Sequence, residues 1–363
     1  MKIIDKICSW SCTPPNPNDL TRANNFNIIR IVASIMVIYG HMSAIMGVPV
    51  FYVYNQAVST IAVKIFFIIS GYLITKSYMS DPNFIRYMVK RIFRIFPALI
   101  AVVLFALFIV GPVFTTLPLS DFFKDSNTWM YLRNILLHPI YSLPGVFADY
   151  TYPNAINGSL WSLPVEFAMY LALPLVVVVF KKLKFLKPGI FLTALFCLAV
   201  DILKMVRYPN FRYVLWGNNL PDWLTLIPFF FIGSFLSFKE FKKYFNLQLA
   251  TALLVAGSLI SVSYVKAEIL LFITLPYFVL SFALCEKPVF CGWFKKCDFS
   301  YGLYLYGFIV QQILYNALKP YGFSLNIMTL ICFVGTLALS VISWYLIEKP
   351  LQRLGAKIVK KIS

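Results

Sequence analysis

The sequence predicts an all-α membrane protein, a polytopic bundle of about ten transmembrane helices with both termini in the cytoplasm. Hydrophobic residues make up 60% of the 363 residues and charged residues only 13%, whereas a soluble domain averages nearer one half and one quarter. Apolar stretches long enough to cross a bilayer of ~30 Å recur from end to end. Basic residues gather on alternate connections, and this sets the orientation.

Each expected span is close to the ~20 residues that a bilayer requires. The ten segments are residues 26–48, 57–78, 95–116, 159–180, 188–205, 222–238, 247–265, 268–284, 299–317 and 325–347. They define a transmembrane domain of residues 26–350 between an N-terminal tail, residues 1–25, and a basic C-terminal tail, residues 351–363. We expect both tails in the cytoplasm of a cell whose inner (plasma) membrane holds the protein.

The net charge of +18 follows this topology. With the N-terminus inside, 23 of the 32 basic residues fall on inner segments and seven on outer segments. This asymmetry is what the positive-inside rule requires. Nucleic acid is therefore not an expected partner, whereas membrane lipid is.

Neither a signal peptide nor a disulfide framework is expected. Residues 1–25 lack a contiguous apolar core and a small-residue cleavage site. The seven cysteines are odd in number and lie in spans or on inner segments. Cys285, Cys291 and Cys297 recur every six residues, but no histidine or Cys-x-x-Cys pair accompanies them, so we expect no metal site.

The inner segment 81–97, DPNFIRYMVKRIFRIFP, is predicted to be a basic amphipathic helix that runs into the third span. Asp81 and Pro82 are typical of a helix start, as N-cap and first helical residue. At 100° per residue its cations share one sector about 140° wide. They are Arg86, Lys90, Arg91 and Arg94. The long outer segment 117–158 is predicted to fold over the outer mouth of the bundle.

Arg30 and His41 stand in the first span, eleven residues apart, and therefore share one helix face within ~20°. Their axial separation is ~16 Å, which places Arg30 near the inner interface and His41 near mid-membrane. Ionisable residues inside a membrane are costly and usually line a cavity or pathway. An imidazole titrates near neutral pH, so His41 is a candidate general base.

Glu166 is the only carboxylate well inside a predicted span. If the fourth span enters at Ser159, Glu166 lies ~10 Å below the outer boundary, nearly the depth of His41. A pair is predicted in which the carboxylate orients the imidazole. Two unrelated polar contacts are the alternative. Trp161, beside the outer interface, is either a belt aromatic or part of a substrate site.

The second span, with the motif KIFFIISGYLI at residues 64–74, carries polar and small residues. Ser70 and Gly71 indicate either close helix packing or a broken helix that lines a cavity. Lys64 is expected either to extend towards the outer surface or to face a polar lumen.

Six motifs in this order resemble the acyltransferase-3 family of integral membrane acyltransferases, over residues 24–353. They are Arg30 and His41 in the first span, FFIISGYL, RIFRIFP, NGSLWSLPVEF, FSYGLYLY and YLIEKP. The resemblance implies a ten-helix bundle that transfers an acyl group, commonly acetyl, from cytoplasmic acyl-coenzyme A to a hydroxyl of a sugar or lipid-linked saccharide. It assigns the family histidine to His41, the motif arginine to Arg30 and the paired arginines to Arg91 and Arg94.

One position departs from the family pattern. Many members place a histidine where this chain has Gly307, so no role of that histidine is carried over, although Gln311 and Gln312 offer polar contacts nearby. No SGNH-type esterase domain follows the bundle, so the stand-alone form is expected.

The resulting hypothesis is an O-acetyltransferase with acetyl-CoA as donor and a bacterial surface glycan, such as O-antigen or capsule units, as acceptor. Arg30, Arg91 and Arg94 would bind the donor phosphates. His41, oriented by Glu166, would deprotonate the acceptor hydroxyl. Possible substrate-site residues that stabilise the oxyanion are Ser70, Trp161 and Tyr304.

Two other classes of protein stay open from the residues alone. A proton-coupled transporter of a polar or anionic solute explains the intramembrane charges equally well, although not the basic inner helix or the ordered motifs. A sensor or a structural subunit without turnover is the other class. In that case the similar depths of His41 and Glu166 would be a coincidence. Turnover of acetyl-coenzyme A with an acceptor present discriminates among them.

The charge distribution predicts that the connection carrying Cys291 and Cys297 lies on the cytoplasmic side. An impermeant thiol reagent applied to intact cells should leave these cysteines unlabelled, and permeabilisation should expose them. Labelling in intact cells would contradict the ten-span topology.

Overall fold

The computed structural model describes residues 25–260, 263–285 and 298–362, and this part of the chain is mostly helical. Its α-helices are α2 (Phe26–Met46), α3 (Val58–Ser80), α4 (Phe84–Phe105), α5 (Gly111–Phe114), α6 (Leu119–Lys124), α7 (Ser126–Met130), α8 (Ser162–Lys182), α9 (Leu186–Arg207), α10 (Leu220–Leu224), α11 (Ile227–Phe235), α12 (Leu247–Leu259), α13 (Tyr264–Ala283), α15 (Ser300–Leu318), α16 (Leu325–Ser343) and α17 (Lys349–Ile362). Two antiparallel hairpins are the only sheets of these residues, β1 (Tyr52–Val53) with β2 (Gln56–Ala57) and β3 (Val214–Leu215) with β4 (Asn218–Asn219).

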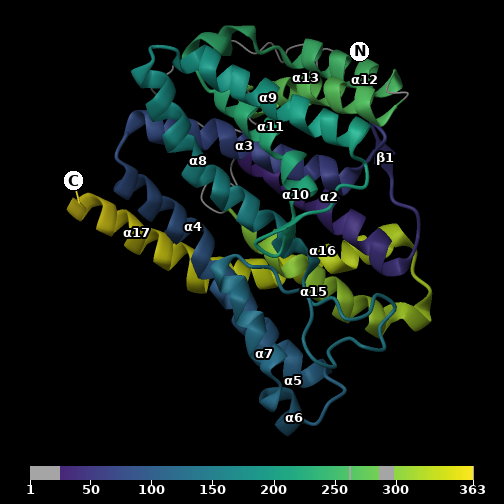
Figure 1. Ribbon diagram of the computed structural model, residues 1–363. Helices are drawn as coiled ribbons and strands as arrows, with labels where there is room; N and C mark the ends of the chain where they lie inside the picture. Colours follow the sequence, from purple (N-terminus) through teal and green to yellow (C-terminus); the bar gives the residue numbers. More distant parts are fainter. Residues whose placement is uncertain (1–24, 261–262, 286–297, 363) are drawn as a thin grey trace, which may run out of the picture.

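The helices form one bundle, with α12 and α13 on one side and α15, α16 and α17 on the other (Figure 1). The first two helices cross its centre, where α2 packs against α3 and α15, and α3 packs against α11. Shorter pieces connect the long helices. They are the 3₁₀ turns η2 (Tyr131–Leu136), η3 (Gly158–Trp161), η4 (Lys239–Tyr244) and η5 (Lys319–Tyr321), and the π-helical turns η1 (Ala106–Val110) and η6 (Trp344–Glu348).

The helical positions agree with a multi-pass membrane protein. Seven helical segments of the described residues are long and apolar enough to cross a membrane. Helices also occupy the other three predicted spans, as α10 with α11, α12 and α15. The all-α membrane fold is therefore confirmed, whereas ten crossings and cytoplasmic termini stay predictions.

The helix predicted for residues 81–97 does run into the third span, since α4, η1 and α5 form one continuous helical segment. Its predicted start is wrong. Asp81 is the residue after α3, and the N-cap of α4 is Asn83, whose side chain accepts a hydrogen bond from the Arg86 amide at 3.0 Å. The Asp81 carboxylate instead accepts hydrogen bonds from the side chains of Arg86 and Lys90. The Arg86 hydrogen bond lowers the pKa of Asp81 to about 2.

The ion pairs with Asp81 separate the four cations of α4 into two groups with different surroundings. Arg86 and Lys90 are neutralised at the helix start by Asp81. Arg91 and Arg94 face the bundle interior, where they line a cavity. The four cations therefore do not act as one surface.

Close helix packing explains Gly71, whereas Ser70 lines a cavity between the helices. Helix α3 is unbroken over its 23 residues. A Cβ atom added to Gly71 would lie 1.9 Å from the Phe230 carbonyl oxygen, and one added to Gly233 would lie 2.3 Å from the Ile68 oxygen. Only glycine permits α3 and α11 to approach this closely, as small residues do in membrane helices. The broken-helix alternative is thus excluded, and the crossing holds Ser70 on a rigid helix.

Both expectations for Lys64 are wrong, because its side chain is fully buried. The ammonium group donates to Glu268 Oε1 at 2.7 Å and to Gln56 Oε1 at 2.8 Å. Glu268 is also fully buried, as is Asp201. Hence Glu166 is not the only carboxylate inside the helices: this ion pair joins α3 to α13, and each charge satisfies the other where water is excluded.

Removing one member of this pair should destabilise the protein strongly. Lys64→Met leaves Glu268 as an uncompensated buried charge, for which we expect a loss of about 3–5 kcal/mol. The double variant Lys64→Met/Glu268→Leu should recover most of that loss. Thermal unfolding in detergent measures both.

The exposed pair of Lys187 and Glu240 provides the matched control, since their side chains are 46% and 59% exposed. Lys187→Met should change stability by no more than about 1 kcal/mol. Equal effects of Lys64→Met and Lys187→Met would contradict a structural role for the buried pair.

Candidate functional site

A cavity of about 270 Å³ opens between α2, α3, α4, α8 and α15. Its polar lining converges from all five helices, while apolar side chains such as Phe66 and Ile95 form the remaining walls. The charged or hydroxyl-bearing lining residues are Arg30, Ser70, Arg91, Arg94, Ser162, Glu166, Tyr170, Ser300, Tyr301 and Tyr304. Convergent polar groups that can fix a ligand's orientation, set beside apolar walls, are typical of a binding site.

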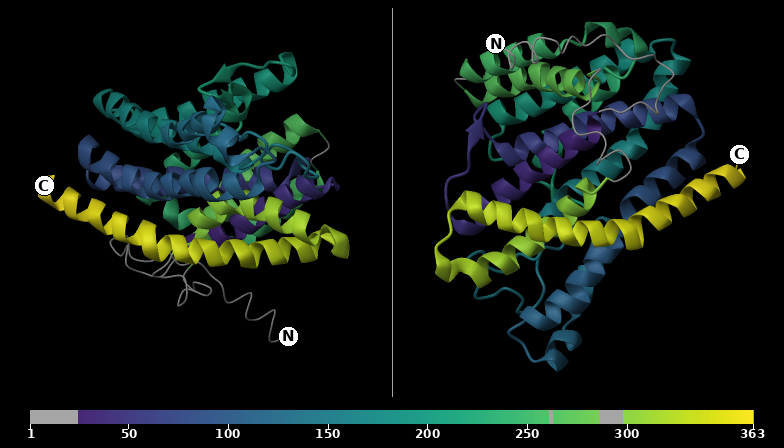
Figure 2. Two further views of the ribbon diagram at one scale, coloured as in Figure 1. Left: turned by 90° about the horizontal axis from the view of Figure 1, so that it is seen from below. Right: turned by 180° about the vertical axis from the view of Figure 1, so that it is seen from behind.

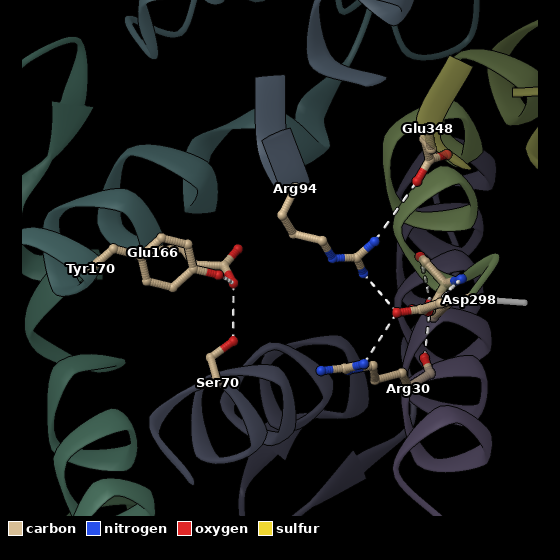
Figure 3. A network of polar contacts seen from close by, with 9 residues as sticks. Arg30, Ser70, Arg94, Glu166, Tyr170, Asp298 and Glu348 are labelled. Carbon is tan, nitrogen blue, oxygen red and sulfur yellow. Dashed lines mark hydrogen bonds and ion pairs between the residues drawn. The ribbon is translucent and has the colours of Figure 1, made fainter. Parts of the chain in front are cut away.

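One carboxylate links two of the three arginines. Asp298 Oδ2 lies 3.1 Å from Arg30 Nη1 and 2.7 Å from Arg94 Nη2 (Figure 3). Burial alone would raise the pKa of Asp298, but the charges of Arg94 and Arg30 outweigh it, and with hydrogen bonds from Ser300 they lower it to about 2. Asp298 is therefore ionised at neutral pH and holds Arg30 of α2 and Arg94 of α4 together.

A second carboxylate reaches Arg94 from the C-terminal side of the chain. Glu348 Oε2 lies 3.8 Å from Arg94 Nη1, and Glu348 is almost fully buried. Its other oxygen accepts a hydrogen bond from Ser343 Oγ at 3.2 Å. Arg94 thus has an acidic partner on each side (Figure 3).

Arg91 is different, because no carboxylate among the described residues lies within ion-pair distance of it. Its guanidinium lies over the rings of Tyr87 and Tyr170, at 5.8 and 5.9 Å from their centroids. Its Nε is buried without a hydrogen-bond partner in this part of the chain. Arg91 is consequently the cavity cation best placed to receive an anionic ligand.

Glu166 occupies the cavity wall opposite Arg30 and Arg94 (Figure 3). Its Oε1 accepts hydrogen bonds from Ser70 Oγ at 2.9 Å and from the Tyr170 hydroxyl at 2.5 Å (Figure 3). Four of the residues predicted to be functional therefore share this cavity with Ser70: Arg30, Arg91, Arg94 and Glu166.

The structure does not bring His41 into hydrogen-bonding contact with Glu166. His41 is not among the described cavity-lining residues, and its ring packs edge-on against Phe308, with centroids 5.2 Å apart. A Cβ atom on Gly158 would meet the same Phe308 ring at 2.9 Å. His41 therefore lies level with the start of η3, and Glu166 lies eight residues further along, ~12 Å deeper.

The depth estimate for Glu166 failed because the fourth span does not begin at the membrane boundary. Asn157 is fully buried and donates to the carbonyl of Leu305, the sixth residue of α15, at 2.8 Å. The chain has already descended into the bundle when η3 begins, so counting from the outer surface places Glu166 too high. Its true level is that of Ser70.

The same level also holds Arg30. Gly40 of α2 meets Ser59 of α3 closely enough that a Cβ atom would lie 2.5 Å from the serine Cβ. This contact sets the antiparallel register of α2 and α3, which places Arg30 near Ser70. His41 is then ~16 Å further along the bundle.

The two remaining predicted substrate-site residues differ in position. The Tyr304 hydroxyl lines the cavity and lies 2.6 Å from Ser162 Oγ. Trp161 is half-buried and is not part of the lining. Its carbonyl accepts a hydrogen bond from the Asn218 side chain at 2.7 Å, which ties η3 to the β3–β4 hairpin.

The side chains of Gln311 and Gln312, near Gly307, donate hydrogen bonds to backbone carbonyl groups. Gln311 donates to the Ile38 carbonyl at 2.6 Å, and Gln312 donates to the carbonyls of Tyr152 and Ala155. These bonds fasten α15 to α2 and to the outer segment 117–158. Residues 152–155 of that segment therefore pack against α15, and its place over the outer mouth of the bundle stays a prediction.

Sequence reasoning missed Asp298, Glu348 and Tyr170. A signal was present, since Asp298 immediately precedes FSYGLYLY, Glu348 belongs to YLIEKP and Tyr170 follows Glu166 by one helical turn. No group of three or more potential metal ligands occurs in the described residues. Two of the three cysteines that recur every six residues, Cys291 and Cys297, lie outside the described residues.

Comparison with known proteins agrees with this arrangement. The model of a family described as "Acyltransferase domain" matches residues 24–345. An "O-acetyl transferase" of Shigella phage Sf6 is 32% identical over 341 residues, which are 90% of this chain and 96% of the phage protein. "Nodulation protein 10" of Rhizobium leguminosarum bv. viciae is 28% identical over 96% of this chain and 98% of its own length.

A more distant similarity covers only part of each chain. The "Peptidoglycan O-acetyltransferase OatA" of Listeria monocytogenes serovar 1/2a is 28% identical over 135 residues, 34% of this chain and 20% of that protein. No solved structure matches the chain.

Proposed function

Because the chain belongs to the acyltransferase-3 family of membrane acyltransferases, we propose that it moves an acetyl group from cytoplasmic acetyl-CoA to a hydroxyl of a surface polysaccharide or lipid-linked saccharide. The observation that carries this proposal is the cavity in which Arg30, Arg91 and Arg94 converge from two helices. The topology that goes with it has ten spans, cytoplasmic termini and an inner-membrane location.

The arginines would bind the donor phosphates, whose geometry suits guanidinium groups. Arg91 supplies the first contact, since it has no acidic partner among the described residues. Arg30 and Arg94, already oriented by Asp298, add charge beside it. The phosphates would therefore occupy the end of the cavity that faces the cytoplasm.

The pantetheine arm would extend outward from there towards His41. Ser70 and Glu166 flank that path, and the carboxylate can accept hydrogen bonds from the amide N–H groups of the arm. This replaces the predicted role of Glu166 as the partner of His41. The ~16 Å between the levels of Arg30 and His41 separates donor binding from chemistry.

His41 would act as general base on an acceptor that enters from the outer side. Its imidazole takes the proton of the acceptor hydroxyl while that oxygen attacks the thioester carbonyl carbon. The carbon–sulfur bond breaks, and the imidazolium returns the proton to the thiolate. The products are the O-acetylated saccharide and coenzyme A.

The names of two relatives support an O-acetyl transfer, and that of the Listeria protein supports a cell-surface glycan as acceptor. Acetyl-coenzyme A turnover by the purified, reconstituted protein, together with mass spectrometry of surface glycans from cells with and without the chain, tests the proposal. A transporter that used the same residues would move solute without consuming the thioester.

The arginines should differ in their effect on donor binding. Arg91→Gln removes the unpaired cation, and we expect the dissociation constant for acetyl-coenzyme A to rise by about 10- to 100-fold, the equivalent of ~1.5–3 kcal/mol. Arg91→Gln/Arg94→Gln should raise it further. Isothermal titration with the purified protein measures both constants.

Arg86→Gln is the matched control, because it removes the same charge from the same helix but at a site paired with Asp81. Donor affinity should stay within about twofold of the wild type. An unchanged affinity in correctly inserted Arg91→Gln protein would reject the donor-site assignment.

Replacing His41 should abolish transfer without loss of donor binding. We expect His41→Ala to reduce turnover by ~10²–10⁴, the usual contribution of a positioned base. His41→Gln, which is polar but cannot accept the proton, should be nearly as inactive.

Coenzyme A binding to the same preparations serves as the control for folding. Near wild-type transfer by His41→Ala would end the general-base mechanism. Loss of coenzyme A binding in the same variant would also contradict it, since the arginine cavity lies at a different level.

A further inference from the structure

The C-terminal helix extends beyond the thickness of a membrane. Residues 325–362 form one continuous helical segment of 38 residues through α16, η6 and α17. At 1.5 Å per residue this segment is ~57 Å long, whereas the hydrocarbon core measures ~30 Å. α16 and η6 already provide enough length to cross, so α17 lies outside the hydrocarbon.

The amino-terminal half of α4 lies beside it. A Cβ atom on Gly355 of α17 would meet the Phe93 side chain at 2.6 Å, so the two helices are in direct contact. Figure 2 shows α17 projecting from the bundle alongside this part of α4. Both helices therefore pass the membrane boundary on the same side.

The charge of α17 is of one sign. Five of its residues are basic and none is acidic: Lys349, Arg353, Lys357, Lys360 and Lys361. At 100° per residue they fall within one arc of about 120°. All of them except Lys349 are exposed, and the Lys349 ammonium lies over the Tyr345 ring.

The adjoining side of α17, centred about 120° from the cations, is apolar and only partly covered. Leu351, Leu354, Ile358 and Ile362 lie within an arc of about 80°. Leu354 is 46% exposed and Ile362 is 41% exposed, although α4 packs against Gly355 between them. A helix with one basic and one apolar face is the form that lies in the interfacial layer of a bilayer.

We propose that α17 is a binding surface for anionic phospholipid, with its apolar side in the acyl boundary and its exposed cations on the lipid headgroups. The partner is a lipid surface because the cations are spread over three turns and converge on no cavity. The donor phosphates are better served by the buried arginines of α2 and α4. Each lysine or arginine near an anionic membrane surface strengthens binding by about fivefold.

Lipid selectivity of the intact protein tests the proposal. Full-length chain in neutral detergent is titrated with phosphatidylglycerol or phosphatidylcholine, and bound lipid is counted by native mass spectrometry. We expect the wild type to bind phosphatidylglycerol at least about tenfold more tightly than phosphatidylcholine. Changing the four exposed cations to glutamine should abolish this difference: Arg353→Gln, Lys357→Gln, Lys360→Gln and Lys361→Gln.

Two controls separate charge on α17 from charge in general. Exchanging lysine and arginine at the same four positions keeps the charge and should keep the selectivity. Lys181→Gln/Lys182→Gln/Lys184→Gln removes three exposed cations from another connection on the inner side of the predicted topology and should also keep it.

The proposal fails if the glutamine variant retains its preference for phosphatidylglycerol, or if the variant of residues 181–184 loses it equally. It fails also if free coenzyme A displaces phosphatidylglycerol from the wild type, since the surface would then belong to the donor. Because no step depends on acyl transfer, failure of the proposed function leaves this test unaffected.

Discussion

The ion pairs of the Asp298 carboxylate are the interaction on which the arginine end of the bundle depends. Arg30 and Arg94 come from different helices, and without an anion between them two positive charges would face each other in a buried site. The carboxylate turns that repulsion into a fixed geometry joining α2, α4 and α15. Glu348 extends the network to the helix that ends the chain.

This pairing also decides which arginine remains available. Arg30 and Arg94 share the charge of one carboxylate, whereas Arg91 meets only aromatic rings among the described residues. An incoming phosphate therefore encounters one unpaired guanidinium beside two oriented ones. Since guanidinium groups are rigid planar donors, such orientation reduces the entropy lost when an anion binds.

The descent of the outer segment into the bundle separates two levels of polar chemistry. The Asn157 side-chain amide donates a hydrogen bond to the Leu305 carbonyl. The fourth span therefore starts inside the bundle and not at its surface. Glu166 consequently joins Ser70 beside the arginines, and His41 is left at the other level with Phe308. If a donor binds from the cytoplasm and an acceptor from outside, the level of the arginines and the level of His41 follow one another between them. The two substrates would then meet near His41.

Hydropathy and charge in the sequence alone determined the helical membrane fold, the order of its helices and the family, because hydrocarbon permits few backbone forms and the motifs are local. Arg30 and Glu166 were also identifiable, since charge inside a span is costly and rarely accidental. Arg91 and Arg94 were identifiable from the motif RIFRIFP. Which charges meet was decided only by tertiary structure. Lys64 finds Glu268 from 204 residues away, and Arg30 finds Asp298 from 268 away. Counting residues along a span paired His41 with Glu166, whereas Glu166 bonds to Ser70 and Tyr170. Such a count fails because packing and backbone hydrogen bonds with other segments decide where each helix begins and ends.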